Sequence, residues 1–286
     1  MNLGIVGAEN SHAAAVANLI NVQKKIKGFR VTQIWGETPA FAESAALKGE
    51  IPIIVNKPEH MIGQIDCVMI DHRDGKYHLP VAEKFIKAGL PVFVDKPLSV
   101  SLKEAKTFLK LRKKYKVPVT TLSAMPLQTA FLTLCREVKK IGDCRLISFV
   151  GPGDFKSKYS GLFFYFIHQV DMMVDLMGGA PVYVQVTKCG NSCTSQCEYK
   201  DGRVVTLTMD PSVSKFHVTA IGSNSIYAQE VATDPDVHLA SAKIFTRMFT
   251  TGKEPFSDTR MLLPIATLEA MVLSLEKCRR IKVGDI

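Results

Sequence analysis

The sequence predicts an α/β protein with two domains. Residues 1–122 are expected to form a parallel sheet flanked by helices, and residues 123–286 an α+β domain with a largely antiparallel sheet. In the first half, short apolar runs alternate with helical segments, which is typical of parallel strands joined by right-handed crossovers. In the second half, runs with a period of two follow one another without crossover helices, which indicates antiparallel pairing with helices on one face. A length of 286 residues allows about two domains.

The first domain is expected to hold six short strands. Apolar runs of four to six residues are bounded by turn residues, and helical segments with alanine or charged faces separate most of them. The strands are expected at 3–7, 30–35, 51–55, 66–70, 91–94 and 118–122, and the helices at 11–20, 39–48, 78–88 and 102–115.

The second domain is expected to begin with a linking helix and to end with a long one. Asp201-Gly202 lies between two alternating runs and indicates a hairpin. The helices are expected at 127–140, 161–179 and 258–278, and the strands at 145–150, 182–188, 194–199, 203–209, 216–221 and 226–230.

Composition restricts the class of protein. Apolar residues make up 47% and charged residues 22%, as in an ordinary globular protein, and no apolar run approaches the roughly 20 residues that span a bilayer. The net charge of +9 comes largely from the basic segment 103–116, which is expected to be the solvated face of one helix rather than a nucleic-acid surface. We therefore expect no membrane and no nucleic-acid partner.

The cysteines indicate a reducing compartment and no metal site. Seven is an odd number, and the chain opens directly into a strand, so reduced thiols in a cytoplasmic protein are expected. Cys189, Cys193 and Cys197 are spaced loosely for zinc, which would need a fourth ligand and usually closer pairs.

The first strand is followed by an incomplete nucleotide-binding loop. A dinucleotide fingerprint reads G-x-G-x-x-G, but residues 7–12 read GAENSH, so only Gly7 matches; Glu9 and His12 stand at the other glycine positions. Asn10 or Ser11 can cap the following helix and leave its positive end facing an anion. The second strand is followed by Glu37, one residue later than the acid that binds the ribose in NAD sites, so NAD and NADP both stay open.

Two further strands end in polar residues. Asp71 and His72 follow the strand at 66–70, and Asp95 and Lys96 follow the strand at 91–94. The carboxyl ends of the strands of an open parallel sheet form its ligand-binding edge. Lys96 is therefore either a proton donor to a carbonyl group or an ordinary lysine at a strand end.

The span from His78 through Ala88-Gly89 to Asp95-Lys96-Pro97 resembles the Gfo/Idh/MocA family of nicotinamide-dependent oxidoreductases. The family reads Glu-Lys-Pro where this chain has Asp95-Lys96-Pro97. The resemblance implies a Rossmann-type dinucleotide-binding domain at 1–122 and places Lys96 near the nicotinamide and the reacting substrate carbon. The cofactor, NAD or NADP, would be bound by Gly7, Glu9, Asn10, Ser11, Glu37, Asp71, His72, Asp95 and Lys96.

The apolar helix at 161–179 carries a second candidate pair. His168 and Asp171 are three residues apart and share a helix face, where the carboxylate can orient the imidazole. They match the second half of the family motif Asp-x-Gly-x-His-x-x-Asp, whereas Phe164 and Phe166 replace its acid and glycine. The resemblance implies that Lys96, His168 and Asp171 are catalytic, with Tyr165 and His168 at the substrate.

The resemblance also implies a function and an assembly. The expected activity is hydride transfer between the nicotinamide and an alcohol or carbonyl carbon of a small sugar- or polyol-like molecule. Residues 123–286 would bind substrate and form a homodimer or homotetramer through their sheet. The alternative is a ligand-binding or regulatory protein that retains the fold without the chemistry.

Overall fold

The computed structural model describes residues 1–284, which divide into two compact units. The first unit comprises 1–99, 103–122 and 238–261, and the second comprises the rest of the described chain, 100–102, 123–237 and 262–284. The sequence-based division assigned 238–261 to the second domain. In the structure this segment instead packs with the N-terminal sheet.

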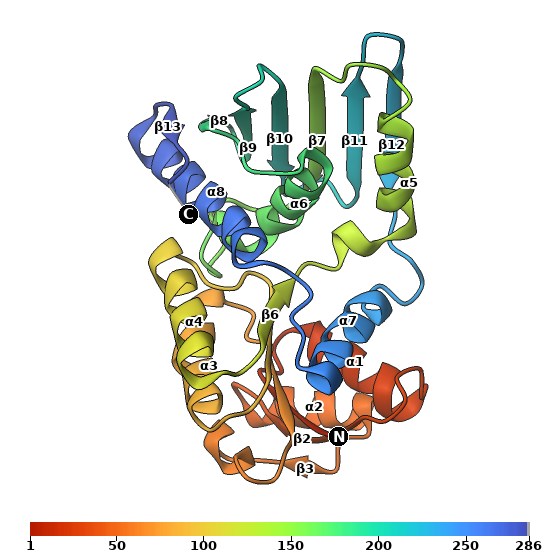
Figure 1. Ribbon diagram of the computed structural model, residues 1–286, viewed down its shortest axis with the longest axis vertical. Coiled ribbons are helices and arrows are strands. Elements are labelled where there is room, and N and C mark those ends of the chain that lie inside the picture. Colours follow the sequence, from red (N-terminus) through yellow and green to blue (C-terminus); the bar gives the residue numbers. More distant parts are fainter. Residues whose placement is uncertain (285–286) are drawn as a thin grey trace. The chain divides into compact units, whose positions relative to one another are not determined.

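A parallel sheet of six strands forms the centre of the first unit (Figure 1), in the order β3-β2-β1-β4-β5-β6. The three central strands are buried almost throughout, because helices cover a parallel sheet on both faces. The predicted fold class of the N-terminal part, a parallel sheet flanked by helices, is therefore confirmed. The strands are β1 (Asn2–Val6), β2 (Arg30–Trp35), β3 (Ile53–Ile54), β4 (Cys67–Ile70), β5 (Val92–Asp95) and β6 (Val119–Leu122).

The helices of this unit lie close to the expected ranges. Thr38 caps α2, because its hydroxyl accepts a hydrogen bond from the Phe41 N–H, and Pro39 occupies the first turn. The helices are α1 (Ser11–Ala17), continued by the π-helical η1 (Asn18–Val22), α2 (Pro39–Gly49), α3 (His78–Lys87), α4 (Leu102–Tyr115) and α7 (Leu239–Thr251), with short 3-10 turns η2 (Pro58–Met61) and η3 (Gly75–Tyr77).

Helix α7 was not predicted from the sequence. It joins the first unit because Phe245 stacks on Phe93 of β5, with the ring centroids 4.3 Å apart and the planes at 16°. Such a pair contributes apolar burial together with a favourable ring geometry. A contact between residues so distant in sequence leaves no local signal.

The basic segment on α4 was expected to be a solvated helix face, but one of its residues is buried. Arg112 is only 7% exposed, and its guanidinium pairs with Glu254 at 2.5 Å and with Asp258. Lys113, on the exposed side, also reaches Asp258 at 2.6 Å. Arg112 therefore fastens the segment that follows α7 to the first unit.

A mixed sheet of seven strands forms the second unit, in the order β12-β11-β7-β10-β9-β8-β13. All pairs are antiparallel except β7 with β10, so the largely antiparallel sheet is confirmed. The short β13 was not predicted. The strands are β7 (Leu146–Pro152), β8 (Tyr183–Cys189), β9 (Ser192–Glu198), β10 (Val204–Asp210), β11 (Phe216–Ile221), β12 (Ile226–Val231) and β13 (Ile281–Lys282).

Helices lie against one face of this sheet (Figure 1), and α6 contacts both β7 and β10. Buried residues alternate along the strands with half-exposed polar ones, and Thr194 and Thr208 share a hydrogen bond of 3.0 Å. The two faces of the sheet thus differ in polarity. The helices are α5 (Thr129–Val138), α6 (Leu162–Met177) and α8 (Asp258–Lys277), with a 3-10 turn η4 (Met125–Leu127).

All seven cysteines lie within the described residues and carry free thiols, as expected. Cys193 and Cys197 are buried on one face of β9, whereas Cys189 is exposed at the end of β8. None of the helices within residues 1–284 is both long and apolar enough to cross a membrane.

Candidate functional site

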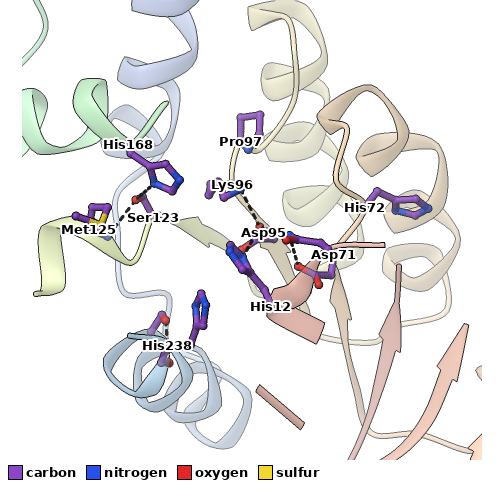
Figure 2. Close-up of polar contacts among 12 residues, drawn as sticks. His12, Asp71, His72, Asp95, Lys96, Pro97, Ser123, Met125, His168 and His238 are labelled. Carbon is purple, nitrogen blue, oxygen red and sulfur yellow. Dashed lines mark hydrogen bonds and ion pairs between the residues drawn. The ribbon is translucent and has the colours of Figure 1, made fainter. Parts of the chain in front are cut away.

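Polar side chains gather at the carboxyl ends of β4 and β5 and at the start of α1 (Figure 2). Asp71 follows β4 directly, Asp95 is the last residue of β5, and Lys96 comes next. Asn10 and His12 approach them from the start of α1. The structure thus places Asn10, Asp71, Asp95 and Lys96 at one edge of the sheet, as the sequence predicted.

Asn10 connects the two carboxylates. Its side-chain amide donates to Asp71 Oδ1 and to Asp95 Oδ2, each at 3.1 Å. Asn10 does occupy the N-cap position of α1, but its side chain makes no capping hydrogen bond. Of the two alternatives for capping, Asn10 therefore supplies the N-cap position but not a side-chain cap, because its amide faces the two buried acids.

His12 contacts Asp95 from the other side. Its Nδ1 lies 3.0 Å from Asp95 Oδ2, and Lys96 Nζ lies 3.7 Å from the same oxygen. The His12 ring packs on the His238 ring at 4.2 Å. Burial, together with the charge of His12, lowers the pKa of His238 to about 4. The sequence treated His12 only as a lost glycine and missed His238.

The two acids of the cluster have opposite pKa shifts. Asp71 is 0% exposed, and burial, reinforced by the negative charge of Asp95, raises its pKa well above the ordinary value. Burial acts in the same direction on Asp95, but the charges of His12 and Lys96 outweigh it and hold the pKa of that carboxyl low. Asp95 is thus the ionised partner of Lys96, and Asp71 binds a proton more readily.

The loop after β1 turns tightly at Gly7. Gly7 has φ +108°, and a Cβ there would lie 2.6 Å from the backbone of Asp71, so a larger residue would not allow this tight turn. Glu37 lies beside the loop, where its Oε2 accepts hydrogen bonds of 2.9 Å from the N–H groups of Ala8 and Glu9. An acid at the end of β2 is the group that binds the ribose in this fold. Ser11 is exposed at the first position of α1.

His72 and His78 lie behind the polar edge. His72 is buried with its ring 5.7 Å from Trp35, and burial lowers its pKa to about 3. The ring nitrogens of His78 face the carbonyl oxygens of Pro97 and His72, each at 2.8 Å. His78 therefore ties the segment after β5 to the segment after β4, which explains why it belongs to the same sequence pattern as Lys96.

In the second unit, Ser123 contacts both members of the predicted pair on α6. Its hydroxyl lies 2.8 Å from His168 Nδ1 (Figure 2). Its backbone N–H donates to Asp171 Oδ2 at 3.2 Å. Tyr165 packs edge-on against His168 at 5.5 Å. Ser123 directly follows β6 and had no signal in the sequence, because it lies 45 residues from His168.

Residues 1–122 match the family model described as an oxidoreductase family with an NAD-binding Rossmann fold, Gfo/Idh/MocA. The resemblance predicted from the sequence is therefore confirmed over these residues, which match the model of that family. The family's description bears out the expected class of enzyme, an oxidoreductase, and the expected type of cofactor. No curated protein matches the chain.

Solved structures with low sequence identity share the fold over nearly the whole chain. The scyllo-inositol dehydrogenase from Lactobacillus casei with NAD(H) and scyllo-inositol has a TM-score of 0.85 at 15% identity, covering 100% of this chain and 99% of that one. A putative myo-inositol dehydrogenase from Sinorhizobium meliloti 1021 has 0.82 at 18%, covering 99% and 100%. The myo-inositol 2-dehydrogenase from Lactobacillus plantarum has 0.84 at 16%, covering 99% of each chain.

Proposed function

We propose that this protein is a dehydrogenase or reductase that transfers hydride between NAD(P) and an alcohol or carbonyl carbon of a small sugar- or polyol-like molecule. The observation that carries the proposal is Lys96, which is 5% exposed and held beside Asp95 at the end of β5 in an oxidoreductase-family domain. The structural neighbours named as inositol dehydrogenases support the class of substrate. The nicotinamide, when bound, supplies or accepts the hydride.

Lys96 is proposed to bind and polarise the reacting oxygen of the substrate. A buried ammonium group stabilises negative charge on oxygen more strongly than a solvated one, because less water screens it. Asp95 Oδ2, 3.7 Å from Nζ, fixes the position of the ammonium group. A residue at the end of a strand is held more precisely than one on a loop, so this ammonium group is already in place before the substrate binds.

His168 is proposed to exchange the hydroxyl proton. The Ser123 hydroxyl lies 2.8 Å from His168 Nδ1 and orients the imidazole, which would take or give the proton. Asp171 holds the backbone of Ser123 and so acts on the imidazole through that residue. Tyr165, packed on the ring, would contact substrate.

The cofactor is proposed to lie along the carboxyl ends of β1, β2, β4 and β5. Gly7 allows close approach of the loop, and Glu37 would bind the ribose hydroxyls, which favours NAD over NADP. The further residues proposed to line the cofactor are Glu9, Asn10, Ser11, Asp71, His72 and Asp95.

Titration of the purified protein with NADH and NADPH, followed by nicotinamide fluorescence, and a polyol panel assayed for turnover test the proposal. Lys96→Met is expected to lower turnover by roughly 10²–10⁴-fold with cofactor binding unchanged. The control Lys84→Met changes an exposed lysine paired with Glu59 and is expected to leave both unchanged. Unaltered turnover in Lys96→Met would refute the role of this lysine.

One observation favours a second function, ligand binding or regulation without redox chemistry. Glu37 already accepts the N–H groups of Ala8 and Glu9, and Glu9 adds a second acid in the loop itself. A diphosphate is repelled by such charges. Absence of NADH and NADPH binding at millimolar concentration would favour this second function over the first.

We further propose that the enzyme acts in the cytoplasm as a homodimer or homotetramer assembled through the C-terminal sheet. The support is the half-exposed polar face of that sheet, which carries Thr194, Thr206 and Thr208. Light scattering of the purified protein measures the oligomer. Thr206→Arg, which places a charge on this face, is expected to yield monomers, and an unchanged mass would exclude this face as the interface.

A further inference from the structure

His12, Asp71 and Asp95 form a compact group of metal-ligating side chains (Figure 2). One nitrogen or oxygen from each residue lies within 4.8 Å of the others. The three residues come from three elements, the first turn of α1 and the ends of β4 and β5, so the sheet and its first helix fix their backbones.

The group brings two buried carboxyl groups close together. Asp71 and Asp95 are 0% and 5% exposed, and Lys96 lies 3.7 Å from Asp95. Asp71 Oδ2 is buried and has no hydrogen-bond partner in the described part of the chain. Buried carboxylates are normally paired, hydrogen-bonded or bound to a metal ion. A cation bound by the group would give this oxygen of Asp71 a partner.

We propose that His12, Asp71 and Asp95 bind one divalent metal ion, with zinc or manganese as the preferred class. An imidazole nitrogen with two carboxylate oxygens suits these metals, whereas calcium and magnesium favour oxygen ligands alone. Three protein ligands leave a position open for water or for a substrate oxygen. The sequence analysis expected no metal site. Its reasoning could not find this one, because the three ligands lie far apart in the sequence at the ends of two strands and the start of a helix.

Binding an ion needs only small changes in the separations of the ligand atoms. At zinc bond lengths of about 2.1 Å, tetrahedral ligand atoms lie roughly 3.4 Å apart. His12 Nδ1 and Asp95 Oδ2 are already 3.0 Å apart, and the remaining separations stay within 4.8 Å. Asn10, whose amide now faces both carboxylates, can turn its Oδ1 to the ion by rotation about the last side-chain bond.

The test uses the full chain after treatment with a chelator. Calorimetric titration with Mn²⁺ and with Zn²⁺ is expected to show one equivalent of ion bound. Thermal unfolding in the presence of each ion is expected to show a raised melting temperature. Mn²⁺ is the decisive probe, because it binds cysteine thiolates poorly and so reports on oxygen and nitrogen ligands. Neither readout depends on redox activity, so the result is independent of whether nicotinamide binds.

Variants assign the binding to these residues. Asp71→Asn keeps the size of a fully buried side chain. His12→Gln changes a side chain that is 18% exposed, so this variant is expected to fold. Each is expected to lower the Mn²⁺ affinity by at least about a hundredfold, more than the loss of an outer-shell partner costs. His60→Gln, at an exposed histidine of the same unit, is the matched control and is expected to bind as the parent does.

Two results would overturn the proposal. One is the lack of stoichiometric binding of either ion by the parent protein, which would leave the group as a network of hydrogen bonds. The other is parental Mn²⁺ affinity in folded His12→Gln, which would place the ion elsewhere.

Discussion

Arg112 offers a quantitative test of how residues 238–261 are held in the first unit. Arg112→Met keeps the aliphatic stem but removes the charge that pairs with Glu254 and Asp258. Breaking a buried ion pair from one side costs about 3–5 kcal/mol, because the remaining charge stays buried. Glu254 and Asp258 are 27% and 32% exposed, so water can hydrate them in part. We therefore expect a loss of about 2–3 kcal/mol in the free energy of unfolding, below the fully buried range.

Urea denaturation of the parent and the variant measures this loss. Lys113→Met is the matched control: Lys113 pairs with the same Asp258 at 2.6 Å, but its side chain is 68% exposed. An exposed pair contributes about 0–1 kcal/mol, because solvent screens it. Hydrogen exchange adds a local measurement, since the amides of α7 are expected to exchange faster in Arg112→Met than in Lys113→Met.

Equal losses in the two variants would refute the reasoning, because burial would then have no influence on the strength of the pair. A loss below about 1 kcal/mol in Arg112→Met would show that apolar packing, including the stacking of Phe245 on Phe93, is sufficient to retain α7.

Three further outcomes are expected. Ser123→Ala should lower turnover about tenfold or more without altering NADH binding, because His168 loses the group that orients its ring; identical kinetics would remove Ser123 from the site. Gly7→Ala should weaken NADH binding and lower the melting temperature, because the added Cβ would meet the backbone of Asp71; a variant that binds and melts like the parent would contradict this. In alkylation of the native protein at pH 8, followed by mass spectrometry, the exposed thiols should react first. Burial raises the pKa of the buried thiols to about 11–12 and keeps them protonated and unreactive. Modification of the buried thiols before the exposed ones would contradict this expectation. The exposed thiols are Cys189 and Cys278, and the buried ones Cys67, Cys193 and Cys197.

The local pattern was sufficient for most of the secondary structure. Strand β2 and helix α4 occupy the predicted residues, because a buried strand and an amphipathic helix each repeat their apolar positions over a short stretch. Helix α7 was not predicted, although it has an ordinary length. The residue on which it packs, Phe93, lies far away in the sequence, so no local pattern indicates this contact.

The sequence alone determined that Asp95 and Lys96 stand at a strand end of a parallel sheet, because strand, turn and helix follow from local periodicity and the order of elements fixes the edge. It also determined that His168 and Asp171 share a face of one helix. Only the tertiary structure decided which residues surround them. Asn10 bridges Asp71 and Asp95, His12 pairs with Asp95, and Ser123 holds His168. These contacts join residues from 45 to 85 positions apart, and the folding of the sheet, rather than any local propensity, brings them together.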